Sequence, residues 1–375
     1  MAVLELSNED SLRLNVLVMN VEAVRIDERS MAVYGLSARG EAKVQLNPTG
    51  RSDQYLRAVR EFLSSYALGS PGGYPVHLNR WTRMGQARDA NLAKLLMLGE
   101  PEAIAAVVCA PGLTEEIARC AWWVDPSSEN ARRMLARECV VQSDMGRALA
   151  DYLIEHLPFE SEPRVIIDTV RLVLQAGLIE PDVRQHLWEK GAAQSVYRIG
   201  FLEAEPDSLP QPLPARADLE TLRPALTKFA SSNNPLALLL LRTLDSPGQT
   251  FAATCEQALH KLSSQEAVVA VLNALSRYFL SVRSSDQPTQ DIALILEEAA
   301  SRLDAWSAAQ ELLAVVPALR PQLLAMQALA HMDEAIVTPI FAHSSATGTL
   351  MRRKIEPVIK PVLAQIAVLR YTPHG

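Results

Sequence analysis

The chain has 375 residues, a net charge of −7 and a hydrophobic fraction of 49%. A chain of this size can bury a large core without disulfides or structural metals, and two or three domains are expected. Acidic residues outnumber basic ones over residues 86–344, which argues against a non-specific nucleic-acid binder because such proteins carry a basic face. Aromatic residues are sparse, and the abundant Leu and Ala favour helices.

The first ten residues are acidic and lack the basic start and apolar core of a targeting signal. The longest leucine run, at 236–241, is far shorter than the roughly 20 residues that a membrane span needs. The four cysteines have no redox or zinc spacing, as expected in a reducing compartment, and Cys109 in an apolar run is expected in the core. We therefore expect a soluble cytoplasmic protein without membrane insertion.

Residues 1–85 are predicted to form a small α+β unit. Turns are expected at 27–30 and 37–40, and a helix is expected to begin near Asp53. Four short β-prone runs precede this helix, at 16–18, 21–26, 31–34 and 42–46.

The segment 68–85 combines four glycines and two prolines with aromatic and basic side chains. Loops of this composition often carry binding residues. Two arginines could hold a carboxylate, a phosphate or a sulfur oxyanion, and the rings could form a partner surface. The candidate residues for partner or anion binding are Tyr74, His77, Arg80, Trp81 and Arg83. The alternative is that this segment only routes the chain from the α+β unit to the helices.

From residue 86 onward the pattern is helical, and residues 86–203 are predicted to form an array of stacked helix pairs. The starts at 126 and 163 are 37 residues apart, as are those at 144 and 181, which is a typical length for helical repeats. The start signals are Pro101, Thr114, Asp125-Pro126, Ser143-Asp144, Glu162-Pro163 and Glu180-Pro181.

Residues 204–220 hold a cluster of prolines and are predicted to be a linker or an extended crossing segment. A C-terminal helical bundle is expected over residues 221–375. Asn234 is expected to cap one helix, and Ser263 with Glu266 to form the capping box of another. The last helix contains Pro357 and Pro361, so it is expected to be kinked or broken.

Motifs for phosphate loops, dinucleotide binding, nucleophile elbows and helical zinc sites are absent from the sequence. We therefore expect no cofactor, no metal and no enzymatic activity. Two thiols remain candidates: Cys120 beside Arg119 and Cys139 near Arg137, since an adjacent cation lowers a thiol pKa. The alternative is that both are buried helix residues. The adjacent Trp122 and Trp123 cannot face one side of a helix, so one could lie at an interface.

Several strings in the chain resemble the DsrS family, and the clearest likeness covers residues 9–205. They include Glu9–Leu17, Ala23–Asp27, Gly35–Ala42, residues 68–86, Leu96–Ala103 and Glu129–Leu135. The resemblance implies a cytoplasmic protein of sulfur-oxidising bacteria that accompanies the dissimilatory sulfite reductase. The family offers no catalytic residues to carry over, and its role is accessory.

Taken with the missing motifs, the resemblance favours a non-enzymatic accessory or regulatory protein that binds partners from the sulfur-oxidation machinery. Stacked helix pairs suit this role because they offer large concave surfaces. Three alternatives stay open. They are a sulfur-relay protein carrying persulfide on Cys120 or Cys139, an RNA-binding regulator that uses Arg80, Arg83 and the basic C-terminal helix, and an enzyme with a site assembled from scattered residues.

Overall fold

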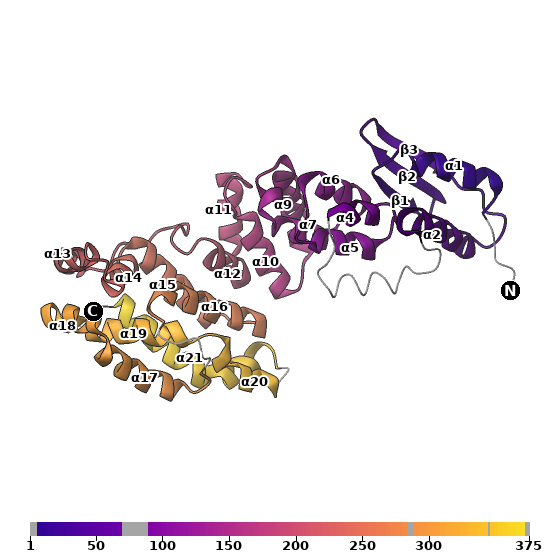
Figure 1. The fold of residues 1–375 in the computed structure, drawn as a ribbon. Coiled ribbons are helices and arrows are strands. Elements are labelled where there is room, and N and C mark those ends of the chain that lie inside the picture. The colour runs from indigo at the N-terminus through magenta and orange to yellow at the C-terminus, as the bar shows by residue number, and fades with distance from the viewer. Residues whose placement is uncertain (1–5, 70–88, 284–288, 344–345, 372–375) are drawn as a thin grey trace. The chain divides into compact units, whose positions relative to one another are not determined.

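The computed structural model describes residues 6–69, 89–283, 289–343 and 346–371 (Figure 1). These residues are mainly helical, with one small antiparallel sheet near the N-terminus. The predicted fold class is therefore confirmed. The chain divides into two compact units, Met1–Pro158 and Phe159–Gly375.

The sheet of the first unit contains β1 (Ala23–Asp27), β2 (Ala32–Ser37) and β3 (Gly40–Gln45), paired antiparallel in that order. The runs expected at 21–26, 31–34 and 42–46 correspond to these strands. The run at 16–18 was wrongly predicted as β, because it ends helix α1 (Asn8–Val18). The buried Leu14, Leu17 and Val18 of this helix are three and four residues apart, which is the helical period.

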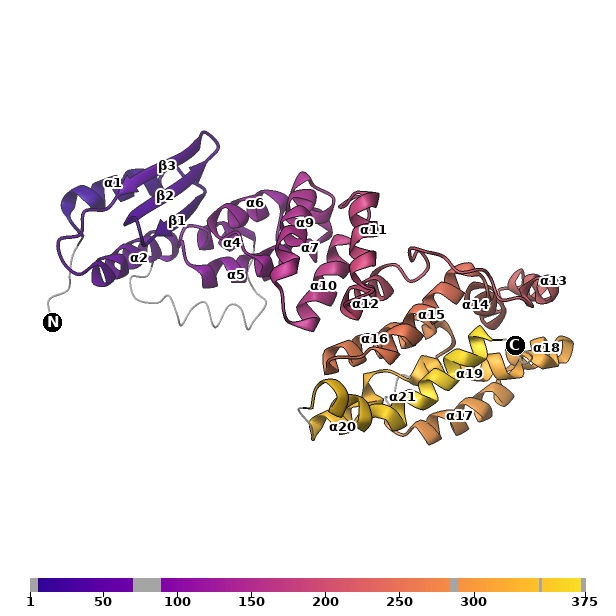
Figure 2. The same ribbon diagram turned by 180° about the vertical axis from the view of Figure 1, so that it is seen from behind.

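Helix α1 packs on one face of the sheet, as both views of the ribbon show (Figures 1 and 2). A Cβ on Gly35 would lie 2.6 Å from Val21 and 2.9 Å from Leu17, so glycine permits this close contact. Helix α2 (Ser52–Leu68) is tied to α1 by Tyr55, whose hydroxyl donates to the buried carboxylate of Asp10. Helix α1 therefore covers one face of the sheet, and the opposite face is available for contacts with other parts of the unit.

The rest of the first unit is a run of helices that begins beside the sheet. The backbone N–H of Val24 in β1 donates to the carbonyl of Leu96 at 2.9 Å, which covers that edge of the sheet. The cap at Thr114 is confirmed, whereas the start predicted at Pro126 lies two residues later, after a cap at Ser127. These helices are α4 (Asp89–Leu95), α5 (Pro101–Cys109), α6 (Glu115–Val124), α7 (Ser128–Leu135), α8 (Glu138–Val141) and α9 (Asp144–His156), followed by the 3₁₀ turn η1 (Leu157–Phe159).

In its described residues the second unit is helical. Its first helices are α10 (Pro163–Val173), α11 (Pro181–Lys190), α12 (Ser195–Ala204), α13 (Leu219–Ala230), α14 (Pro235–Leu244), α15 (Ser246–His260) and α16 (Gln265–Tyr278). They are followed by α17 (Ile292–Ala305), α18 (Ser307–Val315), α19 (Arg320–His331), α20 (Thr338–Ala342) and α21 (Gly348–Arg370), with 3₁₀ turns η2 (Leu280–Val282), η3 (Pro317–Leu319) and η4 (Glu334–Ile336).

Helix α12 packs against α10, α15 and α16, so residues 159–204 belong to the same compact unit as the C-terminal helices. The sequence signals instead predicted one helical array over residues 86–203. Local signals locate helix starts, but they do not show which neighbours a helix packs against. The domain division therefore depends on tertiary contacts.

The proline-rich segment between α12 and α13 crosses the second unit in a fixed conformation. Arg184 donates to the carboxylate of Glu205 at 2.7 Å, and Arg242 donates to Asp207 at 2.7 Å. The Thr250 hydroxyl accepts from the backbone N–H of Leu213 at 2.9 Å. Helices that precede and follow the segment both form hydrogen bonds with it. It is therefore an ordered crossing segment rather than a flexible linker.

One local prediction in the second unit was wrong, and another is narrowed. Helix α16 is capped by Ser264, whose hydroxyl accepts from the N–H of Ala267 at 3.2 Å, and not by Ser263. Helix α21 is continuous from Gly348 to Arg370 although it contains Pro357 and Pro361, so of the expected kink or break the break does not occur. The prolines are four residues apart and therefore share one face, while buried side chains anchor the other face: Ile355, Val358, Ile359, Val362 and Ile366.

The helices of the described residues are all too short or too polar to cross a bilayer.

Candidate interaction site

The binding residues expected in the glycine-rich segment lie outside the described residues: Tyr74, His77, Arg80, Trp81 and Arg83. The other candidates, Trp122, Trp123, Cys120 and Cys139, lie in helices of the first unit. The site is therefore built from these helices and from the sheet beside them.

The two tryptophans of α6 contact different neighbours, as their adjacent positions in a helix require. Trp122 packs edge-on against Tyr152 of α9 with ring centres 4.8 Å apart, and Tyr152 stacks on His156. Trp123 instead reaches the sheet, where its indole N–H donates to the carboxylate of Glu41 at 3.0 Å. Both indoles are half-buried, so each keeps part of its surface accessible.

Trp123 is the first member of a row of alternating rings and cations. The guanidinium carbon of Arg25 lies 4.8 Å from the ring centre of Trp123 and 5.1 Å from that of Tyr34. The ammonium of Lys43 lies 5.5 Å from the Tyr34 ring centre, and Arg25 is 3.6 Å from Glu41. All these distances are within the range of cation–π attraction or ion pairing. We call these five residues the sheet-face cluster.

The strand register explains why these residues meet. Arg25 is paired with Tyr34, and Tyr34 with Lys43, so the three side chains form one row across the sheet. The alternate residues Val24, Val33 and Val44 are buried on the side of α1. Because the valines occupy the buried face, Arg25, Tyr34 and Lys43 lie on the opposite face of the sheet.

The charges on this outer face are balanced. On the same face, Glu41 lies in the row on one side of Arg25, Tyr34 and Lys43, and Asp27 lies in the row on the other side. A strand face that bound nucleic acid through phosphates would carry an excess of positive charge. The composition is closer to that of a protein–protein interface, in which aromatic rings and Arg provide most of the binding energy.

Of these five residues only Trp123 was a candidate from the sequence, whereas Arg25, Tyr34, Glu41 and Lys43 were not predicted. The available signal was the alternation of apolar and polar residues in Val24–Ile26 and Ala42–Val44. That alternation predicts an exposed strand face. It does not predict that α6, about eighty residues further along the chain, brings an indole to it.

The thiols differ in exposure. Cys120 is buried in α6, and this burial, together with the carboxylate of Glu22, raises the pKa of its thiol. Cys255 is fully buried, and burial raises its thiol pKa well above the ordinary value. Cys139 is exposed, and its Sγ donates to the carbonyl of Leu113 at 3.2 Å. Cys109 is exposed as well, which corrects the expectation that it lies in the core, because the apolar residues beside it face inward.

Native protein is expected to react with iodoacetamide at Cys109 and Cys139 and to be protected at Cys120 and Cys255. Thiolate is the reactive form, and burial disfavours it at the two protected positions. Peptide mapping by mass spectrometry measures the labelling, with denatured protein as the control in which all four cysteines react. Labelling of Cys120 at the rate of Cys139 would contradict the buried assignment.

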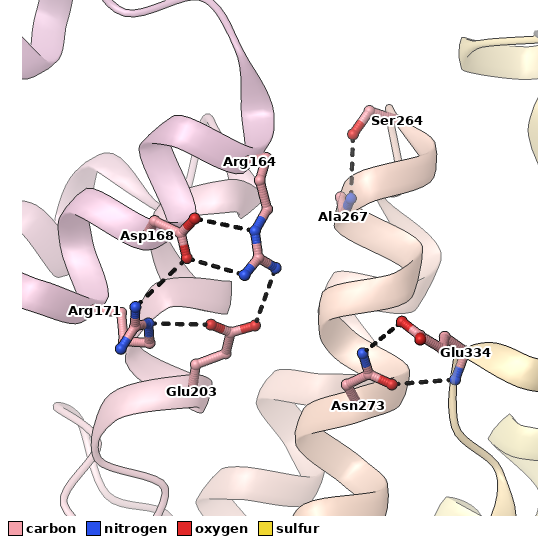
Figure 3. Close-up of polar contacts among 8 residues, drawn as sticks. All are labelled: Arg164, Asp168, Arg171, Glu203, Ser264, Ala267, Asn273 and Glu334. Atoms are coloured by element: carbon pink, nitrogen blue, oxygen red, sulfur yellow. Dashed lines mark hydrogen bonds and ion pairs between the residues drawn. The ribbon is translucent and has the colours of Figure 1, made fainter. Parts of the chain in front are cut away.

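An ionic cluster around the buried Glu203 links α10 to α12 in the second unit (Figure 3). Arg164 holds Asp168 through two contacts of 3.0 Å, and Glu203 lies 3.8 Å from Arg164 and 3.6 Å from Arg171. The Glu203 side chain is 5% exposed, and its burial raises the pKa of the carboxyl against the opposing effect of these arginines.

This cluster joins helices rather than forming an open site, since its carboxylates and guanidinium groups engage one another (Figure 3). Nearby, Asn273 of α16 exchanges two hydrogen bonds with Glu334, which ties α16 to η4. We therefore assign both contacts to the packing of the second unit.

Within the described residues, no group of three or more His, Cys, Asp or Glu side chains is placed to hold a metal ion. Comparison of the chain with protein-family models, with curated proteins and with solved structures gave no match. Function must therefore be argued from the chain's own residues.

Proposed function

We propose that the chain is a cytoplasmic, non-enzymatic accessory or regulatory protein of bacterial sulfur oxidation, and that it binds a partner protein through the sheet-face cluster. The resemblance of residues 9–205 to the DsrS family supports the cellular role. The observation that carries the binding role is the accessible Arg25 guanidinium between the rings of Tyr34 and Trp123.

A guanidinium held between two rings suits recognition. Its carbon lies 5.1 Å and 4.8 Å from the two ring centres, so cation–π attraction restrains the group, and its N–H donors can form two parallel hydrogen bonds with a carboxylate. The Arg25 side chain is 36% exposed and that of Glu41 is 42% exposed, so a partner can reach both. Rigid Arg and aromatic side chains lose little conformational entropy on binding, which favours affinity.

Two alternatives have less support. RNA binding is disfavoured by the balanced charge of the outer sheet face. A persulfide relay through Cys120 is disfavoured by the burial of that thiol, so a relay role would depend on Cys139.

The test is a pull-down from cells growing on reduced sulfur, with the wild-type chain and with Arg25→Ala combined with Lys43→Ala. We expect sulfur-oxidation enzymes to co-purify with the wild type, with or without nuclease, and their recovery to fall about tenfold with the double variant, since central Arg side chains dominate interface energies.

The matched control is Arg51→Ala combined with Arg57→Ala, which removes the same charge from side chains that are 74% and 80% exposed. Equal recovery with the cluster variant and this control would contradict the proposed site. Loss of every partner after nuclease treatment would favour the RNA alternative instead.

A further inference from the structure

The second unit contains a groove of about 260 Å³ between the end of α15 and the first half of α21. Its floor is apolar. Ile355, Ile359 and Leu363 follow one another at four-residue spacing along α21, so they form a stripe on one face of the helix. Leu259 at the end of α15 and Leu262 just after this helix complete the floor. Most of these side chains are largely buried, so the floor is part of the packed core.

The rim of the groove is basic. Arg352 and Lys360 are eight residues apart on α21, so they lie in one row beside the apolar stripe, and His260 lies at the end of α15. The one acidic lining residue, Glu356, pairs with Lys360 at 2.8 Å, and this contact lowers the pKa of its carboxyl. Arg352 donates to the hydroxyl of Thr349 at 3.1 Å and keeps its remaining donors at an exposed position. In a chain of net charge −7, this rim stands out as cationic.

The size of the groove limits what can occupy it. Sites for drug-sized molecules and cofactors usually have volumes of about 300–1,000 Å³, so this groove is small for them. It can accept one or two apolar side chains of a peptide. Its lining residues include no Trp, Tyr or Phe on which a nucleic-acid base could stack. The occupant that fits is therefore a peptide segment with apolar anchors and negative charge.

We propose that this groove is a second docking site, which binds an acidic amphipathic segment of a partner protein. One or two Leu-like side chains of the segment insert between α15 and α21, and its carboxylates lie against Arg352 and Lys360. Charge complementarity sets the preference for an acidic segment, and apolar burial supplies the anchor. The site is independent of the sheet-face cluster.

The test uses the full chain and a fluorescein-labelled helical peptide of about 15 residues, the length at which isolated helices begin to form. The peptide contains Glu and Ala, with two Leu residues four positions apart. Fluorescence anisotropy measures its binding. We expect binding that weakens with salt, and a loss of at least about tenfold when Leu is replaced by Ala or Glu by Lys in the peptide.

In the protein, Arg352→Glu combined with Lys360→Glu is expected to weaken peptide binding at least about tenfold. The matched control is Arg353→Glu combined with Lys354→Glu, which makes the same charge change at positions on α21 that do not line the groove. All four residues are exposed, so the variants should fold. The variant Leu363→Ala tests the floor separately and is also expected to weaken binding.

Equal losses with the groove variant and the control would overturn the proposal, as would binding that survives replacement of the peptide leucines. Tighter binding of polyuridylate RNA than of the peptide would overturn it as well. The sheet-face variant Arg25→Ala with Lys43→Ala should bind the peptide normally, so the outcomes for the two sites are separable.

Discussion

Replacing Gly248 by alanine is expected to lower the free energy of unfolding by about 3 kcal/mol, the upper end of what overpacking usually costs. Gly248 lies in the first turn of α15, against the last turn of α14. A Cβ at this position would lie 2.3 Å from the carbonyl oxygen of Arg242 and 2.4 Å from that of Thr243. Both atoms belong to the backbone, so neither can move aside without displacing α14.

The sign of this effect makes the test decisive. In a helix free of such contacts, alanine in place of glycine stabilises by about 0.5–1 kcal/mol. Urea denaturation of Gly248→Ala measures the change. The control is Gly177→Ala, where a Cβ would meet nothing within 4 Å and the cost is only that of a backbone φ of 81°, about 1 kcal/mol. A gain in stability for Gly248→Ala would show that α14 and α15 are not this close.

Acidification from pH 7 to pH 4 is expected to remove about 3 kcal/mol of stability through His331 alone. This histidine is 3% exposed, and its Nε2 lies 3.0 Å from a guanidinium nitrogen of Arg302. Burial, followed by the charges of Arg302 and Arg283, lowers the pKa of His331 from 6.5 to about 4, against the opposing effect of Glu298 and Asp333. The neutral ring accepts the hydrogen bond from Arg302.

The direction follows from proton uptake. Between pH 6.5 and pH 4 the unfolded chain protonates this histidine while the native protein does not, so unfolding is favoured as the pH falls. Above pH 6.5 the contribution of His331 to stability is fully present. Denaturant unfolding at several pH values, compared between wild type and His331→Gln, isolates this contribution from that of the carboxylates.

We expect the stability difference between these two proteins to change by about 3 kcal/mol between pH 7 and pH 4. The variant His260→Gln, which makes the same exchange at an exposed position, is the control for the substitution itself. If the difference in the free energy of unfolding between wild type and His331→Gln were the same at pH 7 and pH 4, it would contradict the burial of an uncharged His331.

Most helix positions were predictable because their signals are local. Prolines at 101, 163 and 181 begin α5, α10 and α11, and Asn234 caps α14 through its side-chain oxygen, as expected. The failures were local as well. Residues 16–18 are β-branched or apolar and resemble a strand, but they end α1, in which Leu17 and Val18 belong to the buried face. Helix α21 tolerates two internal prolines because its apolar face is anchored in the core.

The candidate site was predictable only in part. The adjacency of Trp122 and Trp123 showed that the two rings cannot face one side of a helix, and they contact Tyr152 and the sheet respectively. That one of them lies at an interface stays a prediction. The partners of that ring are Arg25 and Glu41, which the sequence analysis did not select. Five further candidates, Tyr74, His77, Arg80, Trp81 and Arg83, lie outside the described residues and stay predictions.

By itself the sequence determined a mainly α fold with a small N-terminal sheet, since residue periodicity, caps and prolines act over a few neighbouring residues. Only the tertiary structure decided the division after Pro158, the burial of Cys120 and His331, and the cation–π contact between Arg25 and Trp123. These features arise when elements far apart in the chain pack together. No local pattern encodes which of them will meet, because that choice depends on the packing of the whole core.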